Sequence, residues 1–251
     1  MTAARRTVLA TALAGAVSLA GIGVQELATS AAAARPAVRE VRTIGHTVEG
    51  RDIRAFRLGD AHADRTVVLI GVMHGTERAP ARTLRTLRDG RRPVAGVNLW
   101  VIPVLNIDGS ASGQRANARG VDLNRNFPQD WSRSVTGAGR SAGSEPETRA
   151  LTRFLNQIDP DVVVSLHQPF AAVDTSVSKT PRLARALSRE LNLPRRRIAC
   201  GGPCHGTLTG WFNTTHDGEA ITVEFGPSPS LTYVKHTAVL GLLAAVGGRL
   251  A

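Results

Sequence analysis

His74 and Glu77 are spaced so that an imidazole and a carboxylate can converge on one point. They follow a short apolar run, residues 66–72, whose β-branched and aliphatic residues predict a buried strand ending in a loop. Zinc accepts this pair of ligands and needs a third protein ligand, with a fourth position left for water. Because H-x-x-E often arises by chance, a loop histidine beside a surface glutamate is the alternative for the pair taken alone.

Two further residues, His167 and Glu224, lie in apolar stretches that are expected to be buried. A polar side chain in such a stretch indicates a structural partner or a function. His167 ends the run VVVSLH, 93 residues after His74 (167 − 74 = 93), and is the candidate third ligand. A core histidine bonded to a backbone group is the alternative. Glu224, in ITVEFGP, is a carboxylate within a predicted strand, and such residues are rarely buried unless they are charge-paired or catalytic.

The stretch from Gln114 to Pro128, QRANARGVDLNRNFP, carries three arginines and three asparagines and has little periodicity. A solvated loop is one interpretation. Guanidinium groups, however, bind carboxylates in a fixed fork and stabilise developing oxyanions. A zinc site next to this loop would suit hydrolysis of an amide adjacent to a carboxylate.

Short apolar runs alternate with segments of helical periodicity, which predicts a single α/β domain. Its sheet is expected to be mixed but mainly parallel, with helices on both faces. A hairpin is expected over 38–58, strands over 66–72, 97–105, 161–166 and 220–225, and helices over 80–90, 144–158, 180–191 and 231–246. Segments 110–143 and 193–219 are expected to be loops.

Two local signals refine these boundaries. Ser144 and Glu147 form the S-x-x-E pattern of a helix capping box. Asn106 to Gly109 is a turn signal.

The candidate residues share one placement, at or just beyond the carboxyl end of a predicted strand, where open α/β sheets build their sites. They are His74, Asn106, Asp108, His167 and Glu224.

Six motifs in order, from Ile44 to about Phe225, carry a resemblance to a known family: IGHTVEGR, GVMHGTE, NIDG, RANARGVDLNRNFP, SLHQP and TVEF. The sequence resembles the zinc carboxypeptidases of the carboxypeptidase A/B type, and most closely their compact bacterial branch, the murein peptide amidases. The resemblance implies a fold of that type, one Zn²⁺ per chain, and hydrolysis of the amide bond before a carboxylate-bearing C-terminal residue of a peptide. Murein peptides with a γ-D-glutamyl-diaminopimelate link are the narrower substrate class that it indicates.

Carried over position by position, the resemblance also implies roles for individual residues. The zinc ligands would be His74, Glu77 and His167, with Glu224 as general base and acid. Arg115 matches the arginine that polarises the scissile carbonyl, although Arg119 lies close enough in sequence to compete for that role. Asn124 and Arg125 resemble the pair that holds the terminal carboxylate of the substrate, and Asp122 the carboxylate that orients the first zinc histidine.

One departure from the digestive members concerns a mobile tyrosine, which they place between the last zinc histidine and the general base. The only tyrosine here is Tyr233, which follows Glu224, so ordinary carboxypeptidase specificity is not implied. The corresponding loop holds Cys200, Cys204 and His205. In an exported protein the two cysteines would form a small disulfide, with a metal site that includes His205 as the weaker alternative. His205 is otherwise a solvated loop residue or a substrate contact.

Residues 1–35 have the composition of a secretory signal peptide, which places the peptidase domain at 36–251. A short basic start is followed by an apolar stretch and then by small residues at 31–34 that suit cleavage. Arg5 and Arg6 are typical of the twin-arginine export route, and an uncleaved N-terminal anchor is the alternative. No other segment is apolar enough to span a bilayer. We therefore expect a secreted or cell-envelope protein without a stable membrane span.

The formal net charge of +11 is carried almost wholly by arginine, because Lys179 and Lys235 are the only lysines. No basic run with interleaved aromatic residues is present, so we expect no nucleic-acid partner. The expected partner is a peptide substrate, with a cell-wall peptide as the narrower class, and the protein is expected to be monomeric. Two alternatives stay open: a deacylase of N-acyl amino acids, like the aspartoacylases, and a non-catalytic relative that binds peptides.

Overall fold

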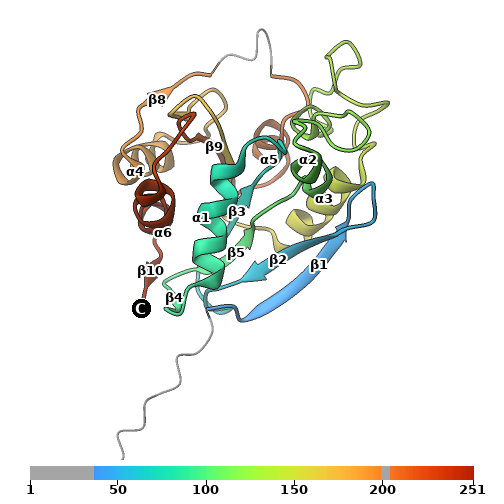
Figure 1. The fold of residues 1–251 in the computed structure, drawn as a ribbon. Helices are drawn as coiled ribbons and strands as arrows, with labels where there is room; N and C mark the ends of the chain where they lie inside the picture. Colours follow the sequence, from blue (N-terminus) through green and yellow to red (C-terminus); the bar gives the residue numbers. More distant parts are fainter. Residues whose placement is uncertain (1–36, 199–203) are drawn as a thin grey trace, which may run out of the picture. The chain divides into compact units, whose positions relative to one another are not determined.

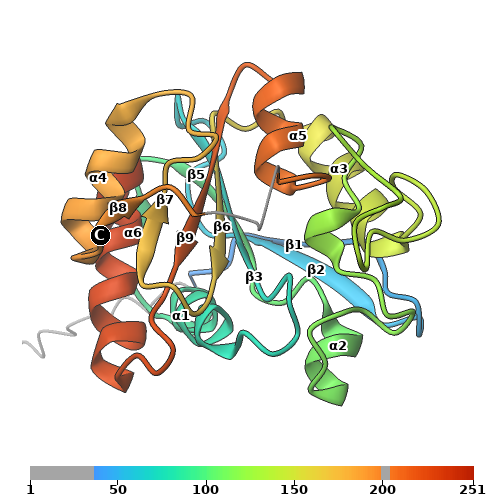
Figure 2. The same cartoon turned by 90° about the horizontal axis from the view of Figure 1, so that it is seen from above.

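The central sheet positions every candidate site residue. In a computed structural model, which describes residues 37–198 and 204–251, eight strands of the described chain form one sheet (Figure 1 and Figure 2). Their order is β1-β2-β5-β3-β6-β9-β7-β8. Its middle consists of four parallel strands, β5 (Asn98–Ile102), β3 (Thr66–Gly71), β6 (Val162–His167) and β9 (Glu219–Glu224).

Antiparallel pairs extend this sheet at both edges. One edge is the hairpin of β1 (Glu40–His46) and β2 (Asp52–Arg57). On the other side β7 (Ala172–Asp174) pairs antiparallel with β9 and parallel with β8 (Arg195–Arg196). The short strands β4 (Val94–Ala95) and β10 (Arg249–Leu250) pair separately.

Helices cover both faces of the sheet, as Figure 2 shows. The helices α1 (Arg78–Asp89), α4 (Pro181–Leu191) and α6 (Ala238–Val246) pack on one face, and α3 (Pro146–Ile158) and α5 (Leu208–Thr215) pack on the other. Three shorter helical segments are α2 (Ile107–Ser112), the 3-10 helix η1 (Leu123–Arg125) and the π-helical segment η2 (Tyr233–Thr237). The predicted fold class is therefore confirmed.

Alternation of side chains along the strands produces two hydrophobic cores. Val67 and Leu69 of β3 pack into the core under α1, α4 and α6, whereas Val68 and Ile70 pack into the core under α3 and α5. All six residues of β6 are buried. A strand covered on both faces has a continuous apolar sequence, which agrees with the strands predicted over 66–72 and 161–166 in a mainly parallel sheet.

The predicted capping box at the start of α3 is wrong. The helix begins at Pro146 with Glu145 as its N-cap residue, and no side chain caps it. The hydroxyl of Ser144 donates to Glu145 Oε1 at 2.7 Å. Glu147 accepts the backbone N–H of Val48 at 3.1 Å, so its carboxylate binds the β1–β2 turn instead of the first turn of its own helix.

Two other segments also differ from the prediction. The turn signal at Asn106 is the start of α2, because the asparagine side chain accepts the N–H of Gly109 at 2.9 Å and so caps the helix. The segment 193–219, expected to be a loop, contains β8 and α5. Thr207 caps α5 by accepting the N–H of Gly210 at 3.1 Å.

The predicted leader, residues 1–35, lies outside the described residues, as does Cys200. The leader, the twin-arginine signal and the Cys200–Cys204 disulfide therefore stay predictions. In the part of the chain that the structure describes, no helix combines the length and the apolar character needed to cross a membrane.

Candidate metal centre and active site

The turn between β3 and α1 places His74 and Glu77 at the carboxyl ends of the central strands. Val72, at the start of the turn, has a φ of 50°, a left-handed conformation that is strained for a β-branched residue. Its carbonyl accepts the N–H of Asn106 at 2.9 Å, which ties the turn to the end of β5. His74 and Glu77 are 3% and 5% exposed. The turn therefore brings both side chains to one buried point.

Gly75 allows this turn to pack against α2. A Cβ atom at this position would lie 2.2 Å from the carbonyl carbon of Gly109 and 2.4 Å from the nitrogen of Ser110. The N–H of Gly75 donates to the carbonyl of Arg115 at 3.1 Å. Only a residue without a Cβ fits at this position of the turn, and its backbone also holds the start of the arginine-rich loop.

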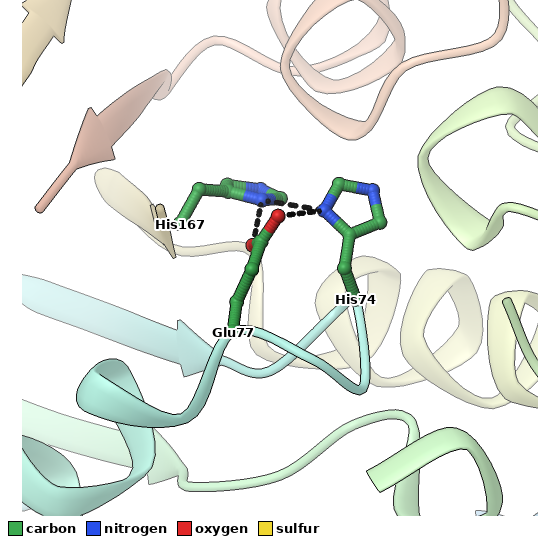
Figure 3. Close-up of side chains that lie close together, drawn as sticks. All are labelled: His74, Glu77 and His167. Carbon is green, nitrogen blue, oxygen red and sulfur yellow. Dashed lines mark hydrogen bonds and ion pairs between the residues drawn. The ribbon is translucent and has the colours of Figure 1, made fainter. Parts of the chain in front are cut away.

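His167, the last residue of β6, completes a cluster with His74 and Glu77 (Figure 3). His74 Nδ1 lies 2.7 Å from Glu77 Oε1, and His167 Nδ1 lies 2.9 Å from Glu77 Oε2. The two Nδ1 atoms are 3.2 Å apart. Ligand atoms from all three residues lie within 4.8 Å of one another, and among the described residues no other group of three or more could hold a metal ion.

The second nitrogen of each imidazole is held from behind. His74 Nε2 lies 3.0 Å from Asp122 Oδ1, and His167 Nε2 lies 2.9 Å from Ser165 Oγ. Partners of this kind fix the ring orientation and tautomer of metal-binding histidines and leave the other nitrogen as the ligand atom. Both Nδ1 atoms then face each other and a carboxylate, so the cluster suits a cation at its centre. The residues present fit zinc, whose catalytic sites use His₂Glu.

In the metal-free cluster, the pKa values of the three residues are shifted in different directions. Burial opposes ionisation of Glu77, but hydrogen bonds with His167 and His74 outweigh it and lower the pKa of Glu77 to about 2. Burial also disfavours the charged form of His74, yet hydrogen bonds with Asp122 and Glu77 raise its pKa. Burial lowers the pKa of His167, which favours the neutral ring that binds metal.

Glu224, the last residue of β9, lies beside His167 in the register of the two parallel strands. It is 7% exposed, and its Oε2 atom is buried without a hydrogen-bond partner among the described residues. Burial, reinforced by the charge of Glu77, raises the pKa of Glu224 to about 7, although a hydrogen bond from the backbone of Phe170 acts in the opposite direction. A carboxyl group with such a pKa can take and return a proton near neutral pH.

Arg115 reaches the metal cluster, whereas Arg119 is engaged elsewhere. Arg115 donates to Glu77 Oε1 through Nη1 at 3.1 Å and to Asp122 Oδ2 through Nε at 3.2 Å. Arg119 forms an ion pair with Glu145 at 3.7 Å. The geometry therefore favours Arg115 over Arg119 as the arginine of the site.

Asn124 and Arg125, in η1, line the same pocket, and each keeps side-chain donors that have no partner in the described chain. Asn124 Oδ1 accepts the N–H of Leu208 at 3.0 Å, which leaves its Nδ2 without a partner in the described chain. Arg125 donates from Nη1 to the carbonyl of Asn124 at 2.8 Å, and its guanidinium forms no ion pair with any described carboxylate. A free guanidinium in a cleft is suited to bind the carboxylate of a ligand.

One pocket of about 350 Å³ joins the predicted residues. It is lined by His74, Glu77, His167, Glu224, Arg115, Asn124 and Arg125. Asp122 supports this set through its hydrogen bonds with His74 and Arg115. The pocket thus brings together the predicted set, with Asp122 behind it.

Other walls of the pocket escaped the sequence analysis; they include Gln168, Phe170, Asp174, Ser176, Thr207, Thr209 and Thr222. Thr222 had a usable signal, since it lies two residues before Glu224 and so on the same face of the strand. Asp174 and Thr209 lie on β7 and α5, two elements that were not predicted.

Two residues singled out at strand ends support the site from outside the pocket. Asn106 is fully buried, and its Nδ2 donates to the carbonyl of Arg115 at 3.1 Å. Asp108 accepts the hydroxyl hydrogen of Thr47 at 2.8 Å and pairs with Arg51, so it joins α2 to the β1–β2 hairpin. The prediction placed both at the end of a strand, but β5 ends at Ile102, Asn106 is the N-cap residue of α2 and Asp108 lies within that helix. Their contacts are with the protein itself.

Part of the segment between β8 and α5 is described by the structure, and of its described residues Ile198, Cys204 and Thr207 line the pocket. His205 is hydrogen-bonded through Nδ1 to the backbone carbonyl of Asp130 at 2.7 Å and does not line the pocket, which agrees with a solvated loop residue. Cys204 lines the pocket. Tyr233 does not line it, so no tyrosine takes the place of the mobile one.

Comparison with known proteins assigns the class. The zinc carboxypeptidase family model matches residues 24–181, which is more than half of the 251 residues. The chain therefore belongs to the zinc carboxypeptidase family and is a zinc peptidase or amidase. The matched range contains His74, Glu77 and His167 and ends before Glu224.

The chain is similar to individual members of this family over most of its length. Murein peptide amidase A of Escherichia coli K12 is 32% identical over 206 residues, which cover 74% of this chain and 81% of that protein. The crystal structure of the murein-tripeptide amidase of Escherichia coli O157 has a TM-score of 0.66 at 29% identity, and the match covers 81% of this chain and 92% of that one. Carboxypeptidase A of Helicoverpa armigera, with a TM-score of 0.69 at 16% identity over 84% of this chain and 69% of that one, shares the fold.

Proposed function

We propose that the chain is an exported zinc metallocarboxypeptidase that hydrolyses the amide bond before the C-terminal residue of a peptide. The observation that carries this proposal is the guanidinium of Arg125, which lines the same pocket as the metal cluster and has no described carboxylate partner. A terminal carboxylate bound there would direct the last amide bond of the peptide towards the cluster and Glu224. Binding of the chain end thus selects the bond to be cut.

His74, Glu77 and His167 would hold the metal. Zinc, when bound, supplies Lewis acidity, which lowers the pKa of water towards about 7 and polarises a carbonyl. Glu224 is placed to manage the proton, because its Oε2 is free and its pKa is about 7 in the metal-free protein. It would take a proton from the attacking water and return it to the leaving amine. No protein nucleophile is needed, so no covalent intermediate forms.

The remaining polar residues would hold the substrate. Arg115, which reaches Glu77 and Asp122 in the absence of substrate, can turn a donor towards the oxygen of the scissile carbonyl as negative charge develops there. The Nδ2 of Asn124 and the guanidinium of Arg125 would bind the terminal carboxylate together. Asp122 would keep the ring of His74 in the orientation for metal binding.

We further propose that the natural substrate is a murein peptide with a γ-D-glutamyl-diaminopimelate link, and that residues 1–35 direct the protein to the envelope where such peptides occur. The similarity to murein peptide amidases supports the substrate, as does a pocket without a tyrosine. The basic and then apolar composition of residues 1–35 supports export.

The test is product analysis by mass spectrometry with the zinc-loaded protein and four substrates. These are a peptide with a free C-terminal carboxylate, the same peptide as a carboxamide, the wall tripeptide ending in diaminopimelate, and an N-acetyl amino acid. We expect loss of the terminal residue from the wall tripeptide and no cleavage of the carboxamide. A chelator should abolish the activity, and added zinc should restore it.

Two variants serve as controls. Glu224→Gln should bind one zinc per chain and be inactive, whereas His167→Gln should lose the zinc itself, as measured by elemental analysis. Turnover of the N-acetyl amino acid alone would identify a deacylase and contradict the proposal. Peptide binding without any turnover in the zinc-loaded protein would also contradict it.

A further inference from the structure

Asp174 lies on the same face of the sheet as Glu224. The strand β7 pairs antiparallel with β9, and Ala172 lies opposite Glu224. Continuing this register places Asp174 beside Thr222, and residues two apart on a strand point to the same face. Two residues of strand and one strand spacing separate the backbones of Asp174 and Glu224, a distance of about 8 Å. Both residues line the pocket.

One oxygen of Asp174 is fully used by the protein, and the other is not. Its Oδ1 accepts the N–H of Ser176 at 2.8 Å, the hydroxyl of Ser176 at 2.6 Å and the N–H of Ile198 at 3.1 Å. Its Oδ2 accepts no hydrogen bond from any described residue. Arg196 is its register neighbour on β8, but no described cation forms an ion pair with Asp174. The half-buried carboxylate is thus held in one orientation with a single free acceptor.

Two threonines line the same pocket as this carboxylate, together with the apolar side chains of Val177 and Ile198. The hydroxyls of Thr209 and Thr222 line the pocket and form no hydrogen bond with any residue that the structure describes. Thr209 is only 5% exposed. An apolar side chain in this part of the pocket would leave these hydroxyls and the carboxylate without partners, which is unfavourable. A side chain with hydrogen-bond donors would satisfy them.

The geometry of the free acceptor distinguishes between cations. A guanidinium binds best to two parallel carboxylate oxygens, and Oδ1 of Asp174 is already occupied. An ammonium is a compact charge with three donors, and Oδ2 with the two threonine hydroxyls offers separate single acceptors.

We propose that Asp174 is the specificity-determining residue of the pocket and selects C-terminal residues whose side chain ends in an ammonium group, such as lysine or diaminopimelate. This inference rests on the proposed function, because it requires the terminal residue of a peptide to occupy the pocket. The terminal carboxylate binds at Arg125 and the side-chain ammonium at Asp174.

The test compares peptides that differ only in the terminal residue, which is lysine, norleucine or arginine. In the wild-type protein we expect kcat/KM for the lysine peptide to exceed that for the norleucine peptide by about 10- to 100-fold. This is the factor that corresponds to the free energy of one hydrogen bond to a charged group. Arginine should fall below lysine. Asp174→Asn removes the charge but keeps an oxygen that can accept the three hydrogen bonds made to Oδ1. The ratio of kcat/KM for lysine to that for norleucine should therefore fall to about threefold or less. Asp174→Glu keeps the charge and should retain part of the preference for lysine.

Asp64→Asn is the matched control, since it removes one exposed charge outside the pocket and should keep the wild-type preference. A wild-type protein without lysine preference, or a folded Asp174→Asn protein that keeps it, would overturn the inference. Calorimetric titration with free lysine and free norleucine tests the role of Asp174 separately from the proposed peptidase activity, because it needs no cleavage. If no peptide is cleaved, tighter binding of lysine that is lost in Asp174→Asn still supports the role of Asp174, and equal binding refutes it.

Discussion

Two arginines four residues apart in one loop have different surroundings, and this difference should be visible in kinetics. Arg115 reaches Glu77 and Asp122 in the pocket, whereas Arg119 pairs with Glu145. We expect Arg115→Ala to lower kcat/KM by about 10²- to 10³-fold, mainly through kcat, which is the loss typical of a removed oxyanion donor. Arg119→Ala removes one partly exposed ion pair and should change kcat/KM by less than about fivefold.

Steady-state kinetics of both variants on one peptide test this assignment, with melting temperatures to verify folding. A larger loss for Arg119→Ala than for Arg115→Ala would exchange the two roles. The two substitutions remove the same side chain from the same loop, so each is the control for the other.

At the level of single residues, the metal cluster could be predicted because the end of a buried strand is visible in sequence as the end of an apolar run. His74 and His167 each follow an apolar run, and parallel strands bring such ends together. Asp174 could not be found in this way. Its position in the pocket depends on the antiparallel pairing of β7, a strand of three residues, with β9. Its single free oxygen depends on Ser176 and Ile198, which donate hydrogen bonds to the other oxygen.

Among the elements, the turn between β3 and α1 is the least tolerant of change. A Cβ at Gly75 would lie 2.2 Å from the carbonyl carbon of Gly109, and neither backbone can move freely. We expect Gly75→Ala to lower the free energy of unfolding by about 2–4 kcal/mol, in the range of severe packing defects. It should also weaken zinc binding, because the turn carries His74 and Glu77.

Chemical denaturation and a zinc titration against a chromophoric chelator measure these effects. The control is Gly226→Ala, close to Glu224, where an added Cβ would meet only the Cβ of Ala171 at 3.9 Å. This control should stay within about 0.5 kcal/mol of the wild-type stability. Wild-type stability and zinc affinity in Gly75→Ala would show that α2 can move away from the turn.

Elements with strong periodicity or long apolar runs were predictable, and short ones were not. The helix α5 (Leu208–Thr215) follows its N-cap residue Thr207 and contains Gly210 and two consecutive threonines, a composition typical of a loop. The helix is stabilised by Trp211 and Phe212, which pack into the core beneath it. Ser144 and Glu147 match a capping box in sequence, but the helix begins at Pro146, one residue later than a cap at Ser144 would require. The carboxylate of Glu147 instead accepts a hydrogen bond from Val48, which is distant in sequence.

For the whole molecule, stability of the metal-free protein should depend on the ionisation of Glu224. Its pKa rises from 4.5 to about 7 on folding, so the folded state binds this proton more tightly. The unfolding free energy therefore falls as pH rises from about 4.5 to about 7, by up to about 3 kcal/mol at about 1.36 kcal/mol per pKa unit. Glu224→Gln removes this loss and should gain stability relative to wild type across that window.

Urea denaturation at several pH values, with a chelator present throughout, tests this expectation. The control is Glu49→Gln, which removes an exposed carboxylate of the β1–β2 turn and should follow the wild-type curve. Parallel curves for Glu224→Gln and wild type between pH 4.5 and 7 would mean that water reaches the Glu224 carboxylate and keeps its pKa ordinary.

The order of strands in the sheet has a consequence for how the protein acquires its activity. The strand β9 is inserted between β6 and β7, although both precede it in the chain. Of the described strands, β9 is the one that joins β7 and β8 to the strand ending in His167 by strand pairing. Its pairing sets Glu224 beside His167 and Thr222 beside Asp174 together. The metal ligands lie at the end of β6 and in the turn after β3, two strands that pair with each other directly. A chain in which β9 is unpaired would therefore lack both its proton carrier and its selectivity, so the two properties are gained or lost together.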